Sequence, residues 1–140
     1  MSEMMITLVR VRCDEVTDDF LEGLSDEFGW RLTVYDLNGK STMTEEVPMV
    51  GIEAVKAGAE YMLDRDLGQI GPEGYEAWLE FWERDTFSED DLLGRLEIRR
   101  DSTGALTVSP SLSTTEHGDG CYRLTGHHGD YTVWLKFETH

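Results

Sequence analysis

Residues 31–40 read Arg-Leu-Thr-Val-Tyr-Asp-Leu-Asn-Gly-Lys and carry the clearest structural signal in the chain. In the first part of this stretch leucine and valine alternate with threonine and tyrosine, which is the two-residue period of a half-buried strand. Asn38-Gly39 is a strong hairpin signal, because a type I′ turn needs positive φ at both central residues. We therefore expect residues 40–46 to return as a polar edge strand, so the fold contains antiparallel β-sheet.

Other segments carry strand signals on either side of this hairpin. Residues 5–12 are short and rich in β-branched side chains, which favours a first strand. A turn over residues 101–104 would bring four apolar side chains to one face of a second hairpin: Leu96, Ile98, Leu106 and Val108. Residues 121–125 and 131–137 are predicted to form a last hairpin around a Gly-His-His-Gly turn.

Helical periodicity is found in three further segments. Residues 17–28 place their apolar and acidic side chains on opposite sides of a helix, and residues 48–66 show apolar positions at helical spacing. A third helix is predicted to start at Pro72, with one more short turn after Ser88. The sequence thus predicts one α+β domain over residues 1–140, with a mostly antiparallel sheet and three or four amphipathic helices packed on one face.

The composition is strongly acidic. The chain has 29 Asp and Glu against 12 Lys and Arg, which gives a formal net charge of −17. This charge disfavours direct binding to nucleic acid or to anionic lipid. We expect no transmembrane helix, because no long apolar run is present, and no signal peptide. Cys13 and Cys121 are too few and too far apart for a secreted disulfide framework, so we expect a cytoplasmic protein with reduced cysteines on strands.

The acidic side chains are the most informative feature for function. On the predicted helices they form stripes on the outer face, and like charges at this spacing cost helix stability. Phe81 lies well round from the centre of its apolar stripe, so it could contribute an exposed anchor. The alternative is that the aromatic side chains of this segment all pack under the sheet. The predicted partner-binding residues, ordered by their weight in this hypothesis, are Glu73, Glu76, Glu80, Glu83, Asp18, Asp19, Glu22, Asp26 and Phe81.

These stripes suggest a small inhibitor that binds a partner protein stoichiometrically and blocks a basic surface. Carboxylates spaced along helices would offer a basic groove what nucleic-acid phosphates offer, so the partner would be a nuclease, a toxin or a nucleic-acid-guided effector. By size and charge alone this describes immunity proteins and phage-encoded, anti-CRISPR-like inhibitors. The sequence does not indicate the oligomeric state.

Two alternatives remain open. The acidic surface is also typical of a domain tuned for solubility in a halophilic proteome. The last 24 residues hold four histidines, which suggests a small metal-dependent enzyme: His117, His127, His128 and His140. A strand over 121–125 would separate the 117 and 127–128 positions by about 16 Å, which argues against one shared site. Accordingly we assign no catalytic residue, metal ligand or cofactor.

Overall fold

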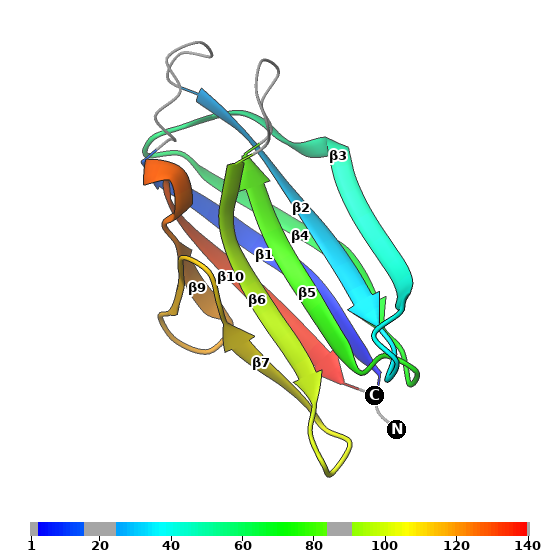
Figure 1. The fold of residues 1–140 in the computed structure, drawn as a ribbon. Coiled ribbons are helices and arrows are strands. Elements are labelled where there is room, and N and C mark those ends of the chain that lie inside the picture. Colours follow the sequence, from blue (N-terminus) through cyan, green and yellow to red (C-terminus); the bar gives the residue numbers. More distant parts are fainter. Residues whose placement is uncertain (1–2, 16–24, 84–90, 140) are drawn as a thin grey trace.

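A computed structural model of the chain describes residues 3–15, 25–83 and 91–139, with the side chains of 25–26 and 42–54 outside that description. Ten strands form two five-stranded antiparallel sheets (Figure 1). Sheet A has the order β4 (Glu60–Ile70), β1 (Met4–Glu15), β10 (Asp130–Thr139), β9 (Cys121–Leu124) and β8 (Thr114–Glu116). Sheet B has the order β3 (Ser41–Lys56), β2 (Ser25–Tyr35), β5 (Glu76–Glu83), β6 (Asp91–Arg100) and β7 (Leu106–Pro110). A short 3₁₀ turn, η1 (Gly126–His128), joins β9 to β10.

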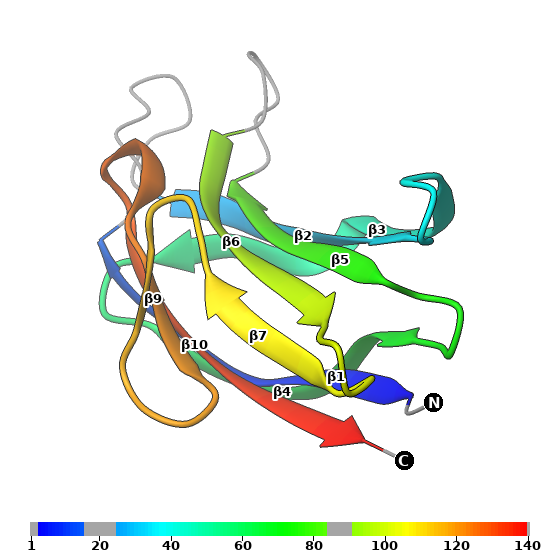
Figure 2. The same ribbon diagram turned by 60° about the horizontal axis from the view of Figure 1, so that its bottom comes forward.

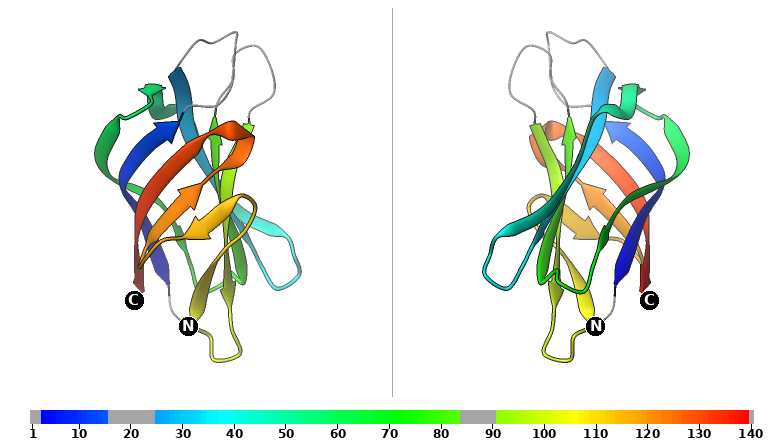
Figure 3. Two further views of the ribbon diagram at one scale, coloured as in Figure 1. Left: turned by 90° about the vertical axis from the view of Figure 1, so that its left-hand side faces the viewer. Right: turned by 90° about the vertical axis from the view of Figure 1, so that its right-hand side faces the viewer.

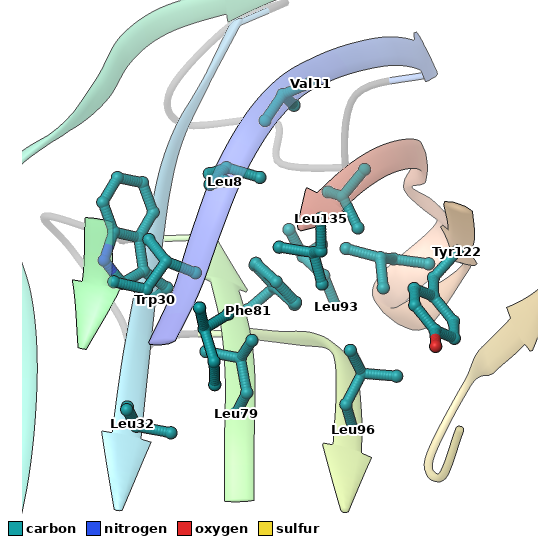
Figure 4. Close-up of a cluster of buried hydrophobic side chains, with 14 of the residues drawn as sticks. Leu8, Val11, Trp30, Leu32, Leu79, Phe81, Leu93, Leu96, Tyr122 and Leu135 are labelled. Carbon is teal, nitrogen blue, oxygen red and sulfur yellow. The ribbon is translucent and has the colours of Figure 1, made fainter. Parts of the chain in front are cut away.

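The two sheets pack face to face as a sandwich (Figures 2 and 3). Along β1, β2, β5, β6 and β10, alternate side chains enter a shared apolar core, which is the arrangement that a two-layer β-fold requires (Figure 4). Three aromatic rings connect the layers. The ring centroid of Phe28 in sheet B lies 5.7 Å from that of Phe81 in the same sheet and 5.2 Å from that of Tyr131 in sheet A. Burying such large apolar side chains supplies most of the free energy that holds the sheets together.

The predicted strands and hairpins are confirmed. Residues 5–12 lie in β1, and β2 returns as the edge strand β3. The turn between them has Gly39 at φ +78° but not Asn38 at positive φ, so the hairpin is confirmed and the type I′ turn is not. The turn over 101–104 joins β6 to β7, and Ile98 pairs with Val108. The last hairpin is β9 and β10, with η1 as its turn.

The predicted α+β class is wrong, because the described residues contain no α-helix. Residues predicted as a helix over 48–66 belong to β3 and β4, and the helix expected after Pro72 is β5. Residues 25–28 of the first predicted helix lie in β2. The rest of that helix, and the short turn after Ser88, fall largely outside the described residues.

Local chemistry explains the correction at 48–66. The segment before Lys56 is rich in β-branched residues, which favour strands, and a tight turn at 57–58 then reverses the chain. Backbone hydrogen bonds between this turn and β1 hold it in place: Gly58 N–H donates to Cys13 O at 2.7 Å, and Cys13 N–H donates to Ala59 O at 2.9 Å. The apolar spacing that resembled a helix therefore spans two strands and a turn.

Three connections and the two ends of the described chain lie at one end of the sandwich (Figure 1). The antiparallel registers bring together Tyr35 at the end of β2, Glu76 at the start of β5 and Arg99 near the end of β6. The β2–β3, β4–β5 and β6–β7 loops leave from these strands. We call this the loop end. Among the described residues, no helix has the length and apolar character needed to cross a membrane.

We predict that Gly126→Ala destabilises the protein through a backbone clash. A methyl group at Gly126 would lie 2.2 Å from Leu92 O and 2.8 Å from Leu93 O, because η1 packs directly on β6. Overpacking of this kind costs about 1–3 kcal/mol of unfolding free energy, measured by urea denaturation. Gly71→Ala is the matched control, since its added methyl would meet no atom within 4 Å. Equal stability of the two variants would contradict the prediction.

Candidate functional site

The predicted acidic stripe of residues 73–83 is divided among three environments. In strand β5 successive side chains point to opposite faces, so Glu76 and Glu80 lie on the outer face of sheet B, while Phe81 and Glu83 enter the core. Phe81 and Glu83 are both 0% exposed, which rules out direct contact with a partner on the folded protein. The prediction that these residues form one exposed surface is therefore wrong.

The outer face of sheet B neutralises its own acidic side chains. Arg95 Nη2 of β6 lies 2.9 Å from Glu80 Oε2, and Arg95 Cζ lies 4.3 Å from the Trp78 ring centroid. On the same strand, Arg99 Nη2 lies 3.3 Å from Glu76 Oε1. The same carboxylate oxygen accepts a hydrogen bond from Trp78 Nε1 at 2.9 Å. Glu80 is only 7% exposed under this cover. Both glutamates are thus committed to holding β5 and β6 together.

Of the other predicted partner-binding residues, the structure describes only Glu73 in full and the backbone of Asp26. Asp18, Asp19 and Glu22 lie outside the described residues. Asp26 belongs to β2 by its backbone pairing, and its side chain is outside the description. Glu73 lies in the β4–β5 loop and is exposed, and it forms no ion pair with the part of the chain that the structure describes.

Glu73 borders a cavity of about 580 Å³ at the loop end. We call it the loop-end cavity. It is lined by the β2–β3 loop (Asp36, Leu37 and Asn38), the β4–β5 loop (Pro72, Glu73, Gly74 and Tyr75) and the end of β6 with its following turn (Arg100, Asp101, Ser102 and Gly104). Three carboxylates, one from each loop, border this space.

Arg100 fixes the loops around the cavity. Its side chain is only 7% exposed and enters from β6. The guanidinium donates to Gly74 O at 2.8 Å and Gly71 O at 2.9 Å in the β4–β5 loop, and to Gly104 O at 2.9 Å in the β6–β7 turn. One planar group with several donors thus joins two loops that are distant in sequence.

The two aspartates are held by their own turns. Asp36 Oδ1 accepts hydrogen bonds from the backbone N–H groups of Asn38 and Lys40, at 2.9 and 3.0 Å. Asp101 Oδ1 likewise accepts from the N–H and hydroxyl of Thr103, at 2.8 and 2.6 Å. The Thr103 hydrogen bonds, the hydroxyl first, hold the pKa of Asp101 below its ordinary value.

Sequence reasoning treated residues 101–104 only as a turn and missed Asp36 and Asp101 as neighbours of Glu73. A local signal was present, because both turns repeat the pattern Asp-x-x-Gly, at 36–39 and 101–104. In each case the aspartate side chain caps the turn that the glycine completes. No sequence pattern shows that the two turns lie beside the same cavity.

The histidines lie apart from this site. His117 follows β8 and His127 and His128 lie in η1, so the two positions are at opposite ends of β9, while His140 is outside the described residues. His127 Nδ1 lies 3.3 Å from Asp91 Oδ1. Within residues 3–15, 25–83 and 91–139, no group of three His, Cys, Asp or Glu side chains is placed to hold a metal ion.

The two cysteines lie on strands, as predicted, and form no disulfide. Cys13 is buried, whereas Cys121 is half-buried on the outer face of sheet A. There it lines a shallow pocket of about 380 Å³ with Arg12, Arg123 and Trp134. Burial raises the pKa of the Cys121 thiol above its ordinary value, and the nearby Arg12 and Arg10 oppose that shift. A raised pKa keeps this thiol protonated and weakly nucleophilic.

Comparisons with known proteins were made for the whole chain. No protein-family model matches it. No curated protein sequence matches it significantly. A solved structure described as "CC2D1B coordinates ESRCT-III activity during the mitotic reformation of the nuclear envelope" aligns with a TM-score of 0.49 and 14% identity, covering 96% of this chain and 54% of that chain. This chain therefore spans about half the length of that chain, and a likeness of this size carries no argument about function.

We predict that Glu80→Ala destabilises the fold while Glu73→Ala does not. Removing Glu80 leaves the Arg95 guanidinium, whose side chain is 19% exposed, without its carboxylate. The loss of charged hydrogen bonds in this setting costs about 1–3 kcal/mol of unfolding free energy. Glu73 is exposed, so its removal should change stability by less than roughly 0.5 kcal/mol. Urea denaturation of both variants measures the difference, and equal losses would refute the assignment.

We predict that Thr103→Val raises the pKa of Asp101 towards the ordinary 3.8, because the variant lacks the hydroxyl donor. A lowered folded-state pKa means that the fold favours the charged carboxylate. Its contribution to stability is present above the ordinary pKa and disappears as the pH falls through the lowered value. Carboxyl ¹³C NMR titration measures the pKa directly. Thr107→Val, whose hydroxyl bonds to Arg99 O, is the control and should leave Asp101 unchanged.

Proposed function

We propose that the protein is a small cytoplasmic binding protein that attaches stoichiometrically to a basic surface of a partner protein and blocks it. The distribution of unpaired acidic side chains supports this proposal. Assignment to the cytoplasm rests on the low cysteine content and on two thiols that are not joined to each other. Neither a catalytic role nor a cofactor is part of the proposal.

On both sheet faces, arginines form ion pairs with acidic side chains. Three such ion pairs lie on sheet A. Their nitrogen-to-oxygen distances are 3.1 Å for Arg10 and Glu60, 3.0 Å for Arg12 and Asp14, and 2.6 Å for Arg123 and Asp130. The outer face of sheet B pairs its arginines and glutamates in the same way. Paired charges of this kind give a partner little net attraction at close range.

The unpaired negative charge lies elsewhere. Exposed acids that form no ion pair within the described part of the chain are found at strand ends, in loops and on edge strand β4. They are Glu15, Glu27, Asp64, Asp66, Glu73, Asp101, Glu116 and Asp119. Exposed charges of one sign attract an oppositely charged protein over about one Debye length and speed its association.

This distribution changes the form of the inhibitor hypothesis. The helical spacing that suggested imitation of a nucleic-acid backbone is absent from the described residues, so that part of the hypothesis is withdrawn. What supports binding is a surplus of unpaired negative charge near strand ends, on edge strand β4 and on loops, and loops are the usual position of binding residues on a rigid β-scaffold. The partner is accordingly defined by a basic protein surface.

The test is capture of partners by the tagged full chain from nuclease-treated host lysate at about 0.1 M salt, repeated at high salt. We expect one stoichiometric partner with a basic surface, lost as salt screens the attraction. Purified partner then binds the parent chain and two single reversals, Glu73→Lys and Glu116→Lys. These make the same change in net charge at two separate exposed positions, one in the β4–β5 loop and one at the end of β8.

A loss of affinity for one reversal and not the other would show a defined interface. Equal effects would mean that only overall charge matters, which contradicts a specific binding surface. No stoichiometric partner at low salt would also overturn the proposal and return the acidic surface to a role in solubility.

A further inference from the structure

The loop-end cavity combines three features, which are the volume of a ligand pocket, exposed apolar side chains and carboxylates. Its volume of about 580 Å³ falls within the range of pockets that hold small ligands, roughly 300–1,000 Å³. Four large apolar side chains are exposed among the described residues, and two of them line this cavity: Leu37 at 76% and Tyr75 at 41%. An exposed aromatic ring beside an aliphatic side chain is typical of a surface that another molecule covers.

The charge around the cavity selects a cation. Asp36, Glu73 and Asp101 come from three different loops and border one space. The opposing charge in the lining is Arg100, which is buried and bonded to three backbone carbonyls. Asp101 accepts hydrogen bonds from the N–H and hydroxyl of Thr103 through Oδ1, which hold its carboxylate in place beside the cavity. The lining thus favours a group that is both positively charged and able to contact apolar surface.

The cavity is also set in place before any ligand arrives. The Arg100 guanidinium joins the β4–β5 loop to the β6–β7 turn, and the two aspartates are fixed by their own turns. Loops that are already ordered lose little conformational entropy on binding, so weak individual contacts suffice.

We propose that the loop-end cavity receives an arginine side chain of the partner protein, an inference that rests on the proposed function. A guanidinium is planar, has five donors for carboxylates and stacks on an aromatic face, whereas an ammonium is a strongly hydrated point charge. Glu73 and the outward carboxylate oxygens of the aspartates accept its N–H groups, and the Tyr75 ring covers its flat face. Leu37 packs against the aliphatic part of the side chain.

The first experiment uses a blocked tripeptide with a central arginine, and its citrulline analogue, which has nearly the same shape and no charge. Each is titrated into ¹⁵N-labelled full-length protein up to about 10 mM, a range suited to single-side-chain affinities. We expect shifts of the amide signals of residues 36–40, 71–75 and 101–105 with the arginine peptide. The citrulline peptide should bind at least about tenfold more weakly.

Two substitutions test the assigned contacts. Glu73→Gln removes one negative charge at the cavity and should weaken binding of the arginine peptide several-fold. Tyr75→Leu keeps an apolar side chain but removes the aromatic face that the guanidinium would stack on. Glu116→Gln is the matched control, because it makes the same change at an exposed acid away from the cavity, at the end of β8. Its affinity should equal that of the parent chain.

Three results would overturn the cavity assignment: no shifts in the three loops at the highest concentration, equal affinity for citrulline, or equal effects of Glu73→Gln and Glu116→Gln. These results are independent of the partner search. If a partner is captured but the peptide does not bind the loops, the cavity assignment fails and the proposed function stands. If the peptide binds the loops but the lysate yields no basic partner, the proposed function fails and the site remains as a guanidinium-binding cavity.

Discussion

The structure depends on one constraint, which is that consecutive side chains of a strand point to opposite faces, and central strand β5 shows its effect most fully. Its inward positions place Leu79 and Phe81 in the core between the sheets. Its outward positions carry glutamates that need cations, and β6 supplies Arg95 and Arg99 at the matching register. Pairing of β5 with β6 therefore satisfies the apolar face and the charged face together. Neither face could be stable without that partner strand.

The same strand explains how far the sequence predicted the fold. Hairpins with a clear turn, such as the one at Asn38-Gly39, were predicted correctly because their signals are local. Residues 75–82 fit a helix by Tyr75, Trp78 and Trp82 and fit a strand by alternation equally well. The choice between the two periods depends on pairing with β2 and β6, which one segment cannot reveal. Glu73 was identified from its charge, whereas its cavity neighbours Asp36 and Asp101 are brought near only by the sheet topology.

The acidic composition has two structural roles that the net charge alone does not separate. Acids on the sheet faces pair with arginines, and several of those arginines also cover tryptophan rings, as Arg10 does at 3.6 Å from the Trp134 centroid. These acids contribute to cohesion of the sandwich. Acids on loops, and Asp64 and Asp66 on edge strand β4, form no such ion pairs among the described residues, so they set the electrostatic field that another protein would meet. Binding and stability can consequently be altered by different substitutions.

The pairing of β1 with β10 has a consequence for biosynthesis. Of the described strands, β1 is synthesised first, and its Met4 pairs with Thr139 of β10, which is synthesised after the other nine. Sheet B is complete in the nascent chain well before β10 is made, whereas the centre of sheet A stays open until then. During that interval the core-facing side chains of β1, among them Leu8 and Val11, lack their neighbours on one side. Closure between such distant segments carries a large entropy cost, so it is the step at which this chain is most exposed to misassociation.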